Sequence, residues 1–462
     1  MFFTREFIGS VIREARFSGE EFPQDGNFSV DSRTVKPGDI FIAFKGARVD
    51  GHDFLADAVK NGARGLIISH DRQACTARVD KESLSRCAVA SVPDTYAALE
   101  ALAAAWRAQF DYPVIGITGS VGKTSTKELI VRILHQAHKK CLYSQANHNT
   151  LLSAALTILR MRPEHEVALF EMGINRRGEM ARIVAMVRPT TALITMIGHS
   201  HMEGLGSIQE IAAEKRAVFT HLRENEIGVI HGDTPLLSSV SYRQPMVRFG
   251  CKMTNQIQAR KVRTQGSCTR FILRAYDQKV PVVIPGNHVG CVMNGLAATA
   301  IANILGIPLP TIVAALQSPV SVDRRFEQKA IKNSRGILID DCYNANPESM
   351  KSALLAFERF EEKRIKIAVL GDMLELGSGT PFWHRQLGRF LRKASSVQRV
   401  ILVGEHVKWI QKTLPARIAH EITPDWQHAL DALQKHLNDD TAILVKGSRA
   451  TGLTNLVNTL AE

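Results

Sequence analysis

The chain has 462 residues, of which 45% are hydrophobic and 22% charged, and this balance excludes a disordered, collagen-like or coiled-coil protein. Because a single core stops growing at about 250–300 residues, the length predicts several domains. Lys and Arg exceed Asp and Glu by 58 to 45, and the net charge of +13 suits anionic ligands such as nucleotides, and would also suit nucleic acid or lipid. Without a low-complexity basic tail, we expect a basic globular surface and no nucleic-acid partner.

The N-terminus does not resemble an export signal, because residues 1–16 carry charges throughout and lack a long apolar run. No uncharged apolar segment approaches the roughly 18–20 residues that a membrane span requires, so we expect no span and a cytoplasmic protein. The seven cysteines form no C-x-x-C pair and are odd in number, which favours reduced thiols over a disulfide framework or a structural zinc site.

The first part of the chain predicts a small α/β domain over residues 1–108. Short apolar runs at 40–44 and 65–68 indicate strands, and residues 54–60 have helical spacing between them. An alanine-rich helix is expected over 96–109.

A second domain is predicted over residues 109–318, after a linker at 111–113. The buried strand 114–118 leads into a helix over 123–137, whose apolar positions repeat every 3.6 residues. Further strands are expected at 167–170, 191–195 and 228–230, with helices between them. This alternation is typical of a doubly wound parallel sheet. The stretch 246–284 alternates basic and apolar residues, which predicts an antiparallel insertion or edge with a solvated charged face.

A third α/β domain, of Rossmann-like type, is predicted over residues 319–462. Strand candidates are 336–340, 365–370, 400–403 and 442–445, each followed or preceded by a helical stretch. The fold class is therefore three-domain α/β, with a central doubly wound ATPase-like domain between a small N-terminal and a C-terminal domain.

The strongest motif runs from Gly116 to Thr126, Gly-Ile-Thr-Gly-Ser-Val-Gly-Lys-Thr-Ser-Thr, where a strand turns into a helix. Its glycines allow several backbone N–H groups to face one phosphate, and the helix adds its positive end. Lys123 supplies a charge for the terminal phosphates, and the Thr124 hydroxyl can bind Mg²⁺. Ile117 stands where the strict motif has its first glycine. A phosphate loop alone does not distinguish motors, kinases, switches and ligases.

Longer strings in all three predicted domains resemble the Mur ligases, which build the stem peptide of peptidoglycan. They are Asp31–Ala43 and Asp50–Phe54, then Glu171–Gly173 and Ile197–Ser207, and finally Asp341–Met350, Leu370–Gly377 and Val445–Arg449. Two of the C-terminal strings, Tyr-Asn-Ala-Asn-Pro and Gly-Asp-Met-Leu-Glu-Leu-Gly, are similar to those of the branch that adds D-alanyl-D-alanine to UDP-N-acetylmuramoyl-tripeptide.

The resemblance implies a three-domain ATP-dependent amide ligase, and we expect the protein to be a monomer. ATP would phosphorylate the terminal carboxylate of the UDP-linked tripeptide, and the amine of D-Ala-D-Ala would attack the acyl phosphate to give amide, ADP and phosphate. Catalysis in such a reaction is largely positioning and neutralisation of charge. The residues implied to be catalytic are Lys123, His201 and Lys215.

The resemblance also implies a Mg²⁺ site made by Thr124, Glu171, His201 and a carbamylated Lys215. Carbamylation converts a cationic lysine into an anionic ligand and requires a neutral amine. Taken alone, Glu171 could equally be a solvated or helix-capping carboxylate, His201 a hydrogen-bonded loop histidine, and Lys215 a lysine on the surface of a helix.

The ATP site implied by the resemblance comprises the loop from Gly119 through Ser120, Val121, Gly122, Lys123 and Thr124 to Ser125, together with Asn294, Arg325, Asp341 and Asn344. Two extra residues separate His288 from Asn294 relative to the family pattern.

The implied substrate contacts are Ser32, Arg33, Gly46, His52, Asn147, Asn149, Lys446 and Arg449. The segment 145–155 departs from the family pattern, and Arg325 and Arg449 fit interdomain salt bridges about as well as ligand contacts.

Three other functions stay open at this point. A related Mur-type ligase would add a single amino acid, and a phosphate-loop ATPase coupled to nucleic acid is permitted by the charge. A scaffold protein without turnover is disfavoured by the retained Lys123, Thr124, Glu171 and His201.

Overall fold

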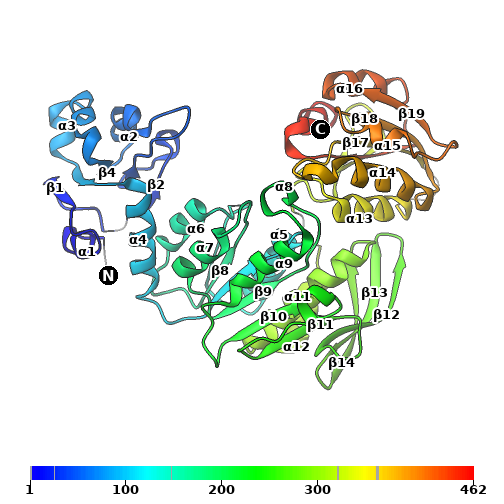
Figure 1. Cartoon of the computed structure of the whole chain (residues 1–462), viewed down its shortest axis with the longest axis horizontal. Helices are drawn as coiled ribbons and strands as arrows, with labels where there is room; N and C mark the ends of the chain where they lie inside the picture. The colour runs from blue at the N-terminus through cyan, green and yellow to red at the C-terminus, as the bar shows by residue number, and fades with distance from the viewer. Residues whose placement is uncertain (1–2, 25, 147, 320–321, 361–363) are drawn as a thin grey trace. The chain divides into compact units, whose positions relative to one another are not determined.

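The computed structural model describes residues 3–24, 26–146, 148–319, 322–360 and 364–462. It contains three sheets, of five, nine and six strands, and every sheet is accompanied by helices (Figure 1). The predicted three-domain α/β fold is thereby confirmed. The chain packs as two compact units, one comprising residues 1–116, 140–172 and 181–190, and the other residues 117–139, 173–180 and 191–462.

The N-terminal sheet has the order β1-β5-β4-β3-β2, with β1 antiparallel and the other neighbours parallel. Its strands are β1 (Arg16–Gly19), β2 (Phe28–Ser29), β3 (Ile40–Ile42), β4 (Gly65–Ser69) and β5 (Ala88–Val92), and its helices are α1 (Arg5–Val11), α2 (Leu55–Lys60), α3 (Lys81–Ser85) and α4 (Thr95–Arg107). Helix α4 begins where the Asp94 carboxylate accepts the N–H groups of Tyr96 and Ala97, an ordinary N-cap.

The central sheet has the order β14-β13-β12-β11-β10-β9-β6-β8-β7. Its first strands are β6 (Val114–Thr118), β7 (Cys141–Tyr143), β8 (Val167–Glu171), β9 (Thr191–Ile194) and β10 (Ile227–His231). Strand β6 is buried along its whole length, which explains why its sequence reads as a continuous apolar run without alternation. The strands predicted at 114–118, 167–170, 191–195 and 228–230 are confirmed.

The prediction of an antiparallel insertion beginning at residue 246 is wrong at its start. Strand β11 (Met246–Gly250) pairs in parallel with β10 and extends the main sheet. The antiparallel ribbon begins later and consists of β12 (Ile257–Gln265), β13 (Cys268–Ala275) and β14 (Gln278–Pro285), as Figure 1 shows. The alternation of buried residues with less buried ones in β13 gives this ribbon one covered face, as the sequence predicts.

Helix α5 (Lys123–Gln136) follows the phosphate loop and packs against α11 (Val289–Ile304) and α12 (Leu309–Gln317). The buried residues of α11 include the small residues Gly295, Ala298 and Ala302, so neighbouring elements can pack close to this helix. The remaining helices of this region are α6 (Leu151–Ile158), α7 (Glu179–Val187), α8 (Met202–Leu205), α9 (Ile208–Arg216) and α10 (Pro235–Ser238).

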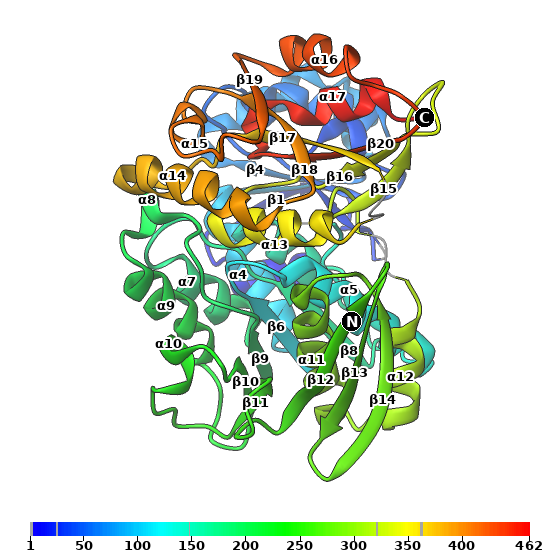
Figure 2. The same ribbon diagram turned by 90° about the vertical axis from the view of Figure 1, so that its right-hand side faces the viewer.

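The C-terminal sheet has the order β15-β16-β20-β17-β18-β19, parallel except for the edge strand β15 (Figure 2). Its strands are β15 (Glu327–Ala330), β16 (Ile337–Asp340), β17 (Ile365–Gly371), β18 (Val397–Val403), β19 (Ala419–Thr423) and β20 (Thr441–Lys446), and its helices are α13 (Pro347–Glu358), α14 (Thr380–Phe390), α15 (Lys408–Gln411), α16 (Trp426–Gln434) and α17 (Leu453–Leu460). Within the described ranges, no helix has the length and apolar character needed to cross a bilayer.

Candidate active site

The phosphate loop joins β6 to α5, as its sequence predicts. Gly122 is the N-cap of α5 and has a left-handed backbone (φ +88°), and a Cβ there would lie 2.5 Å from Asn294 Oδ1. Only glycine fits this combination of backbone angle and close approach. The Lys123 ammonium donates a hydrogen bond of 2.8 Å to the Gly119 carbonyl, which folds the side chain back over the loop.

Two hydroxyl groups tie the phosphate loop to the segment that follows β9. Ser120 Oγ donates to the Gly198 carbonyl and accepts the Gly198 N–H, both at 2.9 Å. Thr195 Oγ1 donates to the Val121 carbonyl at 2.6 Å. The Ser120 hydroxyl therefore holds the loop in shape rather than facing a ligand. These bonds hold the loop in place without a phosphate, which lowers the cost of ordering it on binding.

A cavity of about 760 Å³ adjoins the loop. Seven of the residues predicted from the sequence line it, namely Val121, Gly122, Ser125, Asn294, Arg325, Asp341 and Lys446. They come from the central and the C-terminal domain, so the cavity is completed by side chains far apart in the sequence. A space of this size is within the range of small-molecule and nucleotide sites.

On the central-domain side of the cavity, Asn294 and His288 mark the start of α11. The Thr126 hydroxyl donates to Asn294 Oδ1 at 3.3 Å, so the amide is fixed against the first turn of α5. The His288 ring lies between Cys291 Sγ, at 2.9 Å from Nε2, and Ser352 Oγ, at 3.3 Å from Nδ1. Burial lowers the pKa of His288 and raises that of Cys291 to about 12, so the ring and the thiol are both neutral near pH 7.

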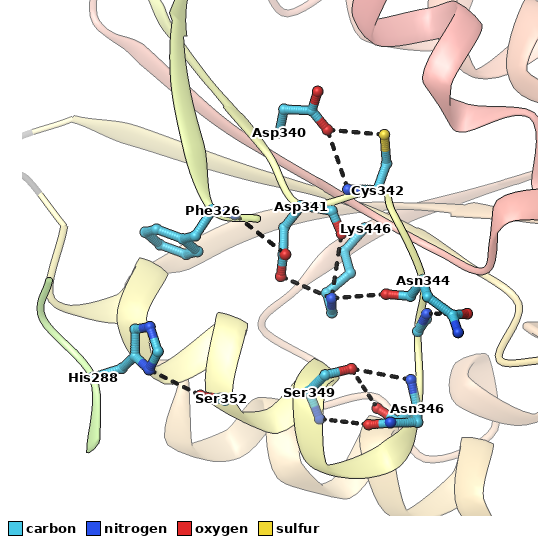
Figure 3. A network of polar contacts seen from close by, with 11 residues as sticks. His288, Phe326, Asp340, Asp341, Cys342, Asn344, Asn346, Ser349, Ser352 and Lys446 are labelled. Carbon is cyan, nitrogen blue, oxygen red and sulfur yellow. Dashed lines mark hydrogen bonds and ion pairs between the residues drawn. The ribbon is translucent and has the colours of Figure 1, made fainter. Parts of the chain in front are cut away.

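On the C-terminal side, Asp341 is the centre of a polar network (Figure 3). Its carboxylate accepts the Phe326 N–H at 3.2 Å and lies 2.8 Å from the Lys446 ammonium. Lys446 is 2% exposed and also donates to the carbonyl oxygens of Asp341 and Asn344. The three N–H donors of the Lys446 ammonium are thus satisfied within the protein, so its main role is to support the cavity wall.

Arg325 and Asn344 are both predicted to contact the nucleotide, but only Arg325 lines the cavity. The Arg325 guanidinium stacks on the Tyr343 ring, with its central carbon 4.0 Å from the ring centroid, which keeps the cation at the cavity wall. Asn344 Oδ1 accepts the N–H of Ala345, and Asn344 does not line the cavity.

Glu171, at the end of β8, combines deep burial with an unsatisfied oxygen. It is 1% exposed, and Asn149 Nδ2 donates to its Oε1 at 2.9 Å. Its backbone N–H donates to Ser144 Oγ. The second carboxylate oxygen, Oε2, is buried without a hydrogen-bond partner. A buried carboxylate oxygen left unpaired is costly and fits the hard oxygen ligand that Mg²⁺ prefers.

Lys215, in α9, is 1% exposed, so it is not a lysine on the surface of a helix. Burial lowers its pKa well below the ordinary value, and the nearby Lys123 ammonium lowers it further. A neutral amine is the form that reacts with CO₂, so the environment of Lys215 fits carbamylation. Thr124 is also buried, at 7% exposure, in the first turn of α5.

His201 has a left-handed backbone (φ 57°) and lies directly before α8. Its Nδ1 is 2.6 Å from Glu375 Oε2, a residue between β17 and α14. Among the described residues, no group of three or more His, Cys, Asp or Glu side chains is arranged to hold a metal ion. A Mg²⁺ site here must therefore draw on other donors, such as a carbamate, a hydroxyl or phosphate oxygens.

The N-terminal domain holds the predicted substrate residues Ser32, Arg33, Gly46 and His52. Arg33 is exposed and forms a two-pronged contact with Asp31, at 2.9 and 2.7 Å. His52 is fully buried, with Nδ1 2.6 Å from Asp50 and Nε2 accepting the Ser69 N–H at 3.0 Å. Both ring nitrogens are engaged, so His52 can shape this loop but offers no atom to a ligand.

Three further predicted residues lie outside the cavity or outside the described part of the chain. Asn147 lies outside the described residues. Ser32 is 8% exposed, and its carbonyl accepts a hydrogen bond from the side chain of Asn61. Arg449 is exposed and does not line the cavity.

Reasoning from the sequence missed Glu348 and Glu375. Glu348 Oε1 lies 2.6 Å from His199 Nδ1, and Glu348 also lines the cavity. The sequence signal for Glu348 was its position in the first turn of a helix that begins at Pro347, where carboxylates are common. Glu375 lies in the string Leu370–Gly377 that resembles the family, but its contact could not be predicted, because its partner is more than 170 residues away in the sequence.

Family models match along nearly the whole chain. They are described as "Mur ligase family, catalytic domain" over residues 27–107, "Mur ligase middle domain" over 117–302, and "Mur ligase, glutamate ligase domain" over 324–449. The resemblance found in the sequence motifs is thus confirmed.

Individual relatives belong to the same family as the matching models. The UDP-N-acetylmuramoyl-tripeptide–D-alanyl-D-alanine ligases of Escherichia coli (strain K12) and Bacillus subtilis (strain 168) are 33% and 32% identical, each over 94% of this chain and 93% of the relative. A crystal structure of MurF from Acinetobacter baumannii matches with a TM-score of 0.86 and 27% identity, over 99% of this chain and 98% of that one. The MurF ligase of Thermotoga maritima in complex with ADP matches with a TM-score of 0.79 and 27% identity, over 94% and 97%.

Proposed function

Because this chain belongs to the family of UDP-N-acetylmuramoyl-tripeptide–D-alanyl-D-alanine ligases, we propose that it joins D-alanyl-D-alanine to UDP-N-acetylmuramoyl-tripeptide with consumption of ATP. The observation that carries this function is the combination of full-length similarity with a cavity of about 760 Å³ beside an intact phosphate loop.

The reaction proceeds in two steps. The terminal carboxylate of the tripeptide attacks the γ-phosphorus of ATP, and the bond to the β-phosphate oxygen breaks to release ADP. The amine of D-Ala-D-Ala then attacks the acyl carbon, and the tetrahedral intermediate expels inorganic phosphate and a proton to leave the amide. Both steps gather anions, so the residues of the site serve mainly to position them and to neutralise charge.

The nucleotide is held by the loop Gly119–Ser125 and by the cavity walls. Backbone N–H groups and the start of α5 face the phosphates, and Lys123 places its ammonium on the phosphoryl oxygens. Asn294 and Arg325 approach the nucleotide from the central and C-terminal domains. Asp341 and Lys446 hold the wall between them by their own ion pair, and Asn344 supports Lys446 through its carbonyl.

The donors for Mg²⁺ are Thr124, Glu171, His201 and, once carbamylated, Lys215. The unpaired Oε2 of Glu171 and the buried amine of Lys215 are the two observations that support this set. Bound Mg²⁺ would neutralise negative charge on the phosphate oxygens. The protein's part is to keep Glu171 in a fixed orientation through Asn149.

The UDP-linked tripeptide is assigned to the N-terminal domain, through Ser32, Arg33, Gly46 and the loop shaped by His52. Asn147 and Asn149 are proposed as further substrate contacts, and Arg449 is proposed to bind a substrate carboxylate, for which a guanidinium is well suited. We place the domain limits at 1–108, 109–318 and 319–462, and propose that the enzyme works in the cytoplasm as a monomer.

The test is phosphate release with ATP, Mg²⁺, UDP-N-acetylmuramoyl-tripeptide and D-Ala-D-Ala, omitting each component in turn. Phosphate release and a product heavier by one D-Ala-D-Ala unit, seen by mass spectrometry, should require all of them. Replacing the dipeptide with single amino acids separates this function from that of a ligase adding one residue. Release that ignored both peptides would overturn the proposal.

A further inference from the structure

Two residues with left-handed backbones meet where the central and C-terminal domains touch. His201 has φ 57° and Glu375 has φ 61°, and neither is glycine. The His201 Nδ1 lies 2.6 Å from Glu375 Oε2, and the Glu203 N–H donates to the Glu375 carbonyl at 3.0 Å. Non-glycine residues adopt this backbone region only when the surrounding structure compensates, and such residues concentrate at functional sites.

A simple surface ion pair does not account for this arrangement. The His201 and Glu375 side chains are 20% and 53% exposed, and ion pairs at such positions contribute little to stability. Two strained backbones are a large cost for so weak a contact. The geometry is better explained by what the carboxylate does to the imidazole. The Glu375 carboxylate lies against the Nδ1 edge of the ring, so Nε2 is the ring nitrogen that this contact leaves for another ligand.

A second carboxylate of the C-terminal domain holds the same segment two residues earlier. Glu348 accepts the His199 backbone N–H at 3.1 Å and lies 2.6 Å from His199 Nδ1. Gly198 makes room for it, since a Cβ there would lie 2.8 Å from the Glu348 carboxyl carbon. The Trp383 ring packs on His199 with centroids 4.1 Å apart. The segment is therefore fixed on both sides of residue 200 by groups from the C-terminal domain.

We propose that Glu375 is a positioning residue for metal binding: it orients His201 so that Nε2 faces Mg²⁺, and it does so only from the docked C-terminal domain. This inference rests on the proposed role of His201 as a metal donor. It makes metal affinity a property of both domains, because a carboxylate behind a ligating histidine fixes its tautomer and its direction. The metal site would then be complete only when the C-terminal domain is docked.

The test measures Mn²⁺ binding by electron paramagnetic resonance in the presence of ADP, using the full-length protein. We expect E375A to weaken Mn²⁺ binding about 10-fold, the range seen when the support of a metal ligand is removed. E375G should show the same loss, because it removes the carboxylate while relieving the left-handed backbone. E375Q should restore most of the affinity, since its amide has nearly the same shape and its oxygen can lie against Nδ1 as the carboxylate does.

The matched control is E203A, which removes an exposed carboxylate two residues from His201. It should bind Mn²⁺ like the wild type. In a double-mutant cycle, E375A should have no further effect once His201 is replaced by alanine, because Glu375 acts through that ring. Unchanged Mn²⁺ affinity in both E375A and E375G, or an equal added loss in the H201A background, would overturn the inference. If the wild type formed no ligated product, the proposed function would fail instead, and the Mn²⁺ comparison would still stand.

Discussion

The Lys446 ammonium lies 2.8 Å from Asp341 Oδ2, and both residues are at least nine-tenths buried at the edge of the cavity. They come from the ends of two neighbouring parallel strands, β16 and β20. The carboxyl ends of strands in such a sheet are where ligands bind. The pair, which Figure 3 shows, therefore links the ends of these strands to the residues that line the cavity.

Removal of one partner of this pair should be more harmful than removal of both. D341A leaves a buried ammonium facing only carbonyl oxygens, and we expect a loss of about 3 kcal/mol in the free energy of unfolding. The double variant D341A/K446M removes the buried charge and should recover part of that loss. Urea denaturation measures both values, and equal stability of the single and double variants would contradict the expected coupling.

Replacement of Lys123 should abolish ligation without unfolding the protein. K123A removes the cation that meets the transferring phosphoryl group, and we expect the rate to fall at least about 100-fold, the scale found for loss of one such group. Phosphate release and product formation are the measurements. K140A, at an exposed position just beyond the same helix, is the control and should retain full activity. Intact synthesis in a well-folded K123A protein would contradict the proposed site.

Local sequence was sufficient for the elements near the phosphate loop. The apolar run of β6 and the 3.6-residue period of α5 are strong, and the loop between them carries its own chemistry. Strand β15 could not be predicted in this way. Its sequence, Glu-Gln-Lys-Ala, is polar because the strand lies at the edge of the sheet, and only its pairing with β16 makes it a strand.

The candidate site was predictable by residue type but not by contact. His52 follows Asp50 and Gly51 in a string that resembles a substrate loop, yet the Ser69 N–H occupies its second nitrogen. The role of Glu375 likewise depends on its contact with His201, a residue of another domain. Such contacts depend on how strands and loops pack in three dimensions, and periodicity along the chain carries no information about them.

Substitution of Gly122 tests the shape of the loop independently of its charge. G122A places a Cβ near Asn294 Oδ1 and forces alanine into a left-handed backbone, so ADP binding should weaken and stability should fall by about 1–3 kcal/mol. The double variant G122A/N294A removes the clash but not the backbone strain, and should recover only part of the stability. Calorimetry of ADP binding and thermal unfolding give both values. Full recovery in the double variant would show that crowding alone is responsible.

The chemical state of Lys215 should depend on pH. Burial and the Lys123 ammonium lower the pKa of its amine, so the neutral form exists at lower pH than for an ordinary lysine. Carbamylation consumes this neutral amine, so the carbamate should be present at mildly alkaline pH and should disappear as the pH falls and the amine is protonated. Carbon-13 NMR of protein equilibrated with labelled bicarbonate measures it directly.

The matched variant is K215M, which keeps a long unbranched side chain in the same buried space but has no amine. It should lose the carbamate signal and most of the ligase activity while remaining folded, since a buried ammonium or amine is replaced by an apolar group of similar length. A carbamate resonance that persisted in K215M would place the modification on another lysine. Wild-type protein with full activity and no carbamate signal at any pH would show that Lys215 serves the site as an unmodified amine.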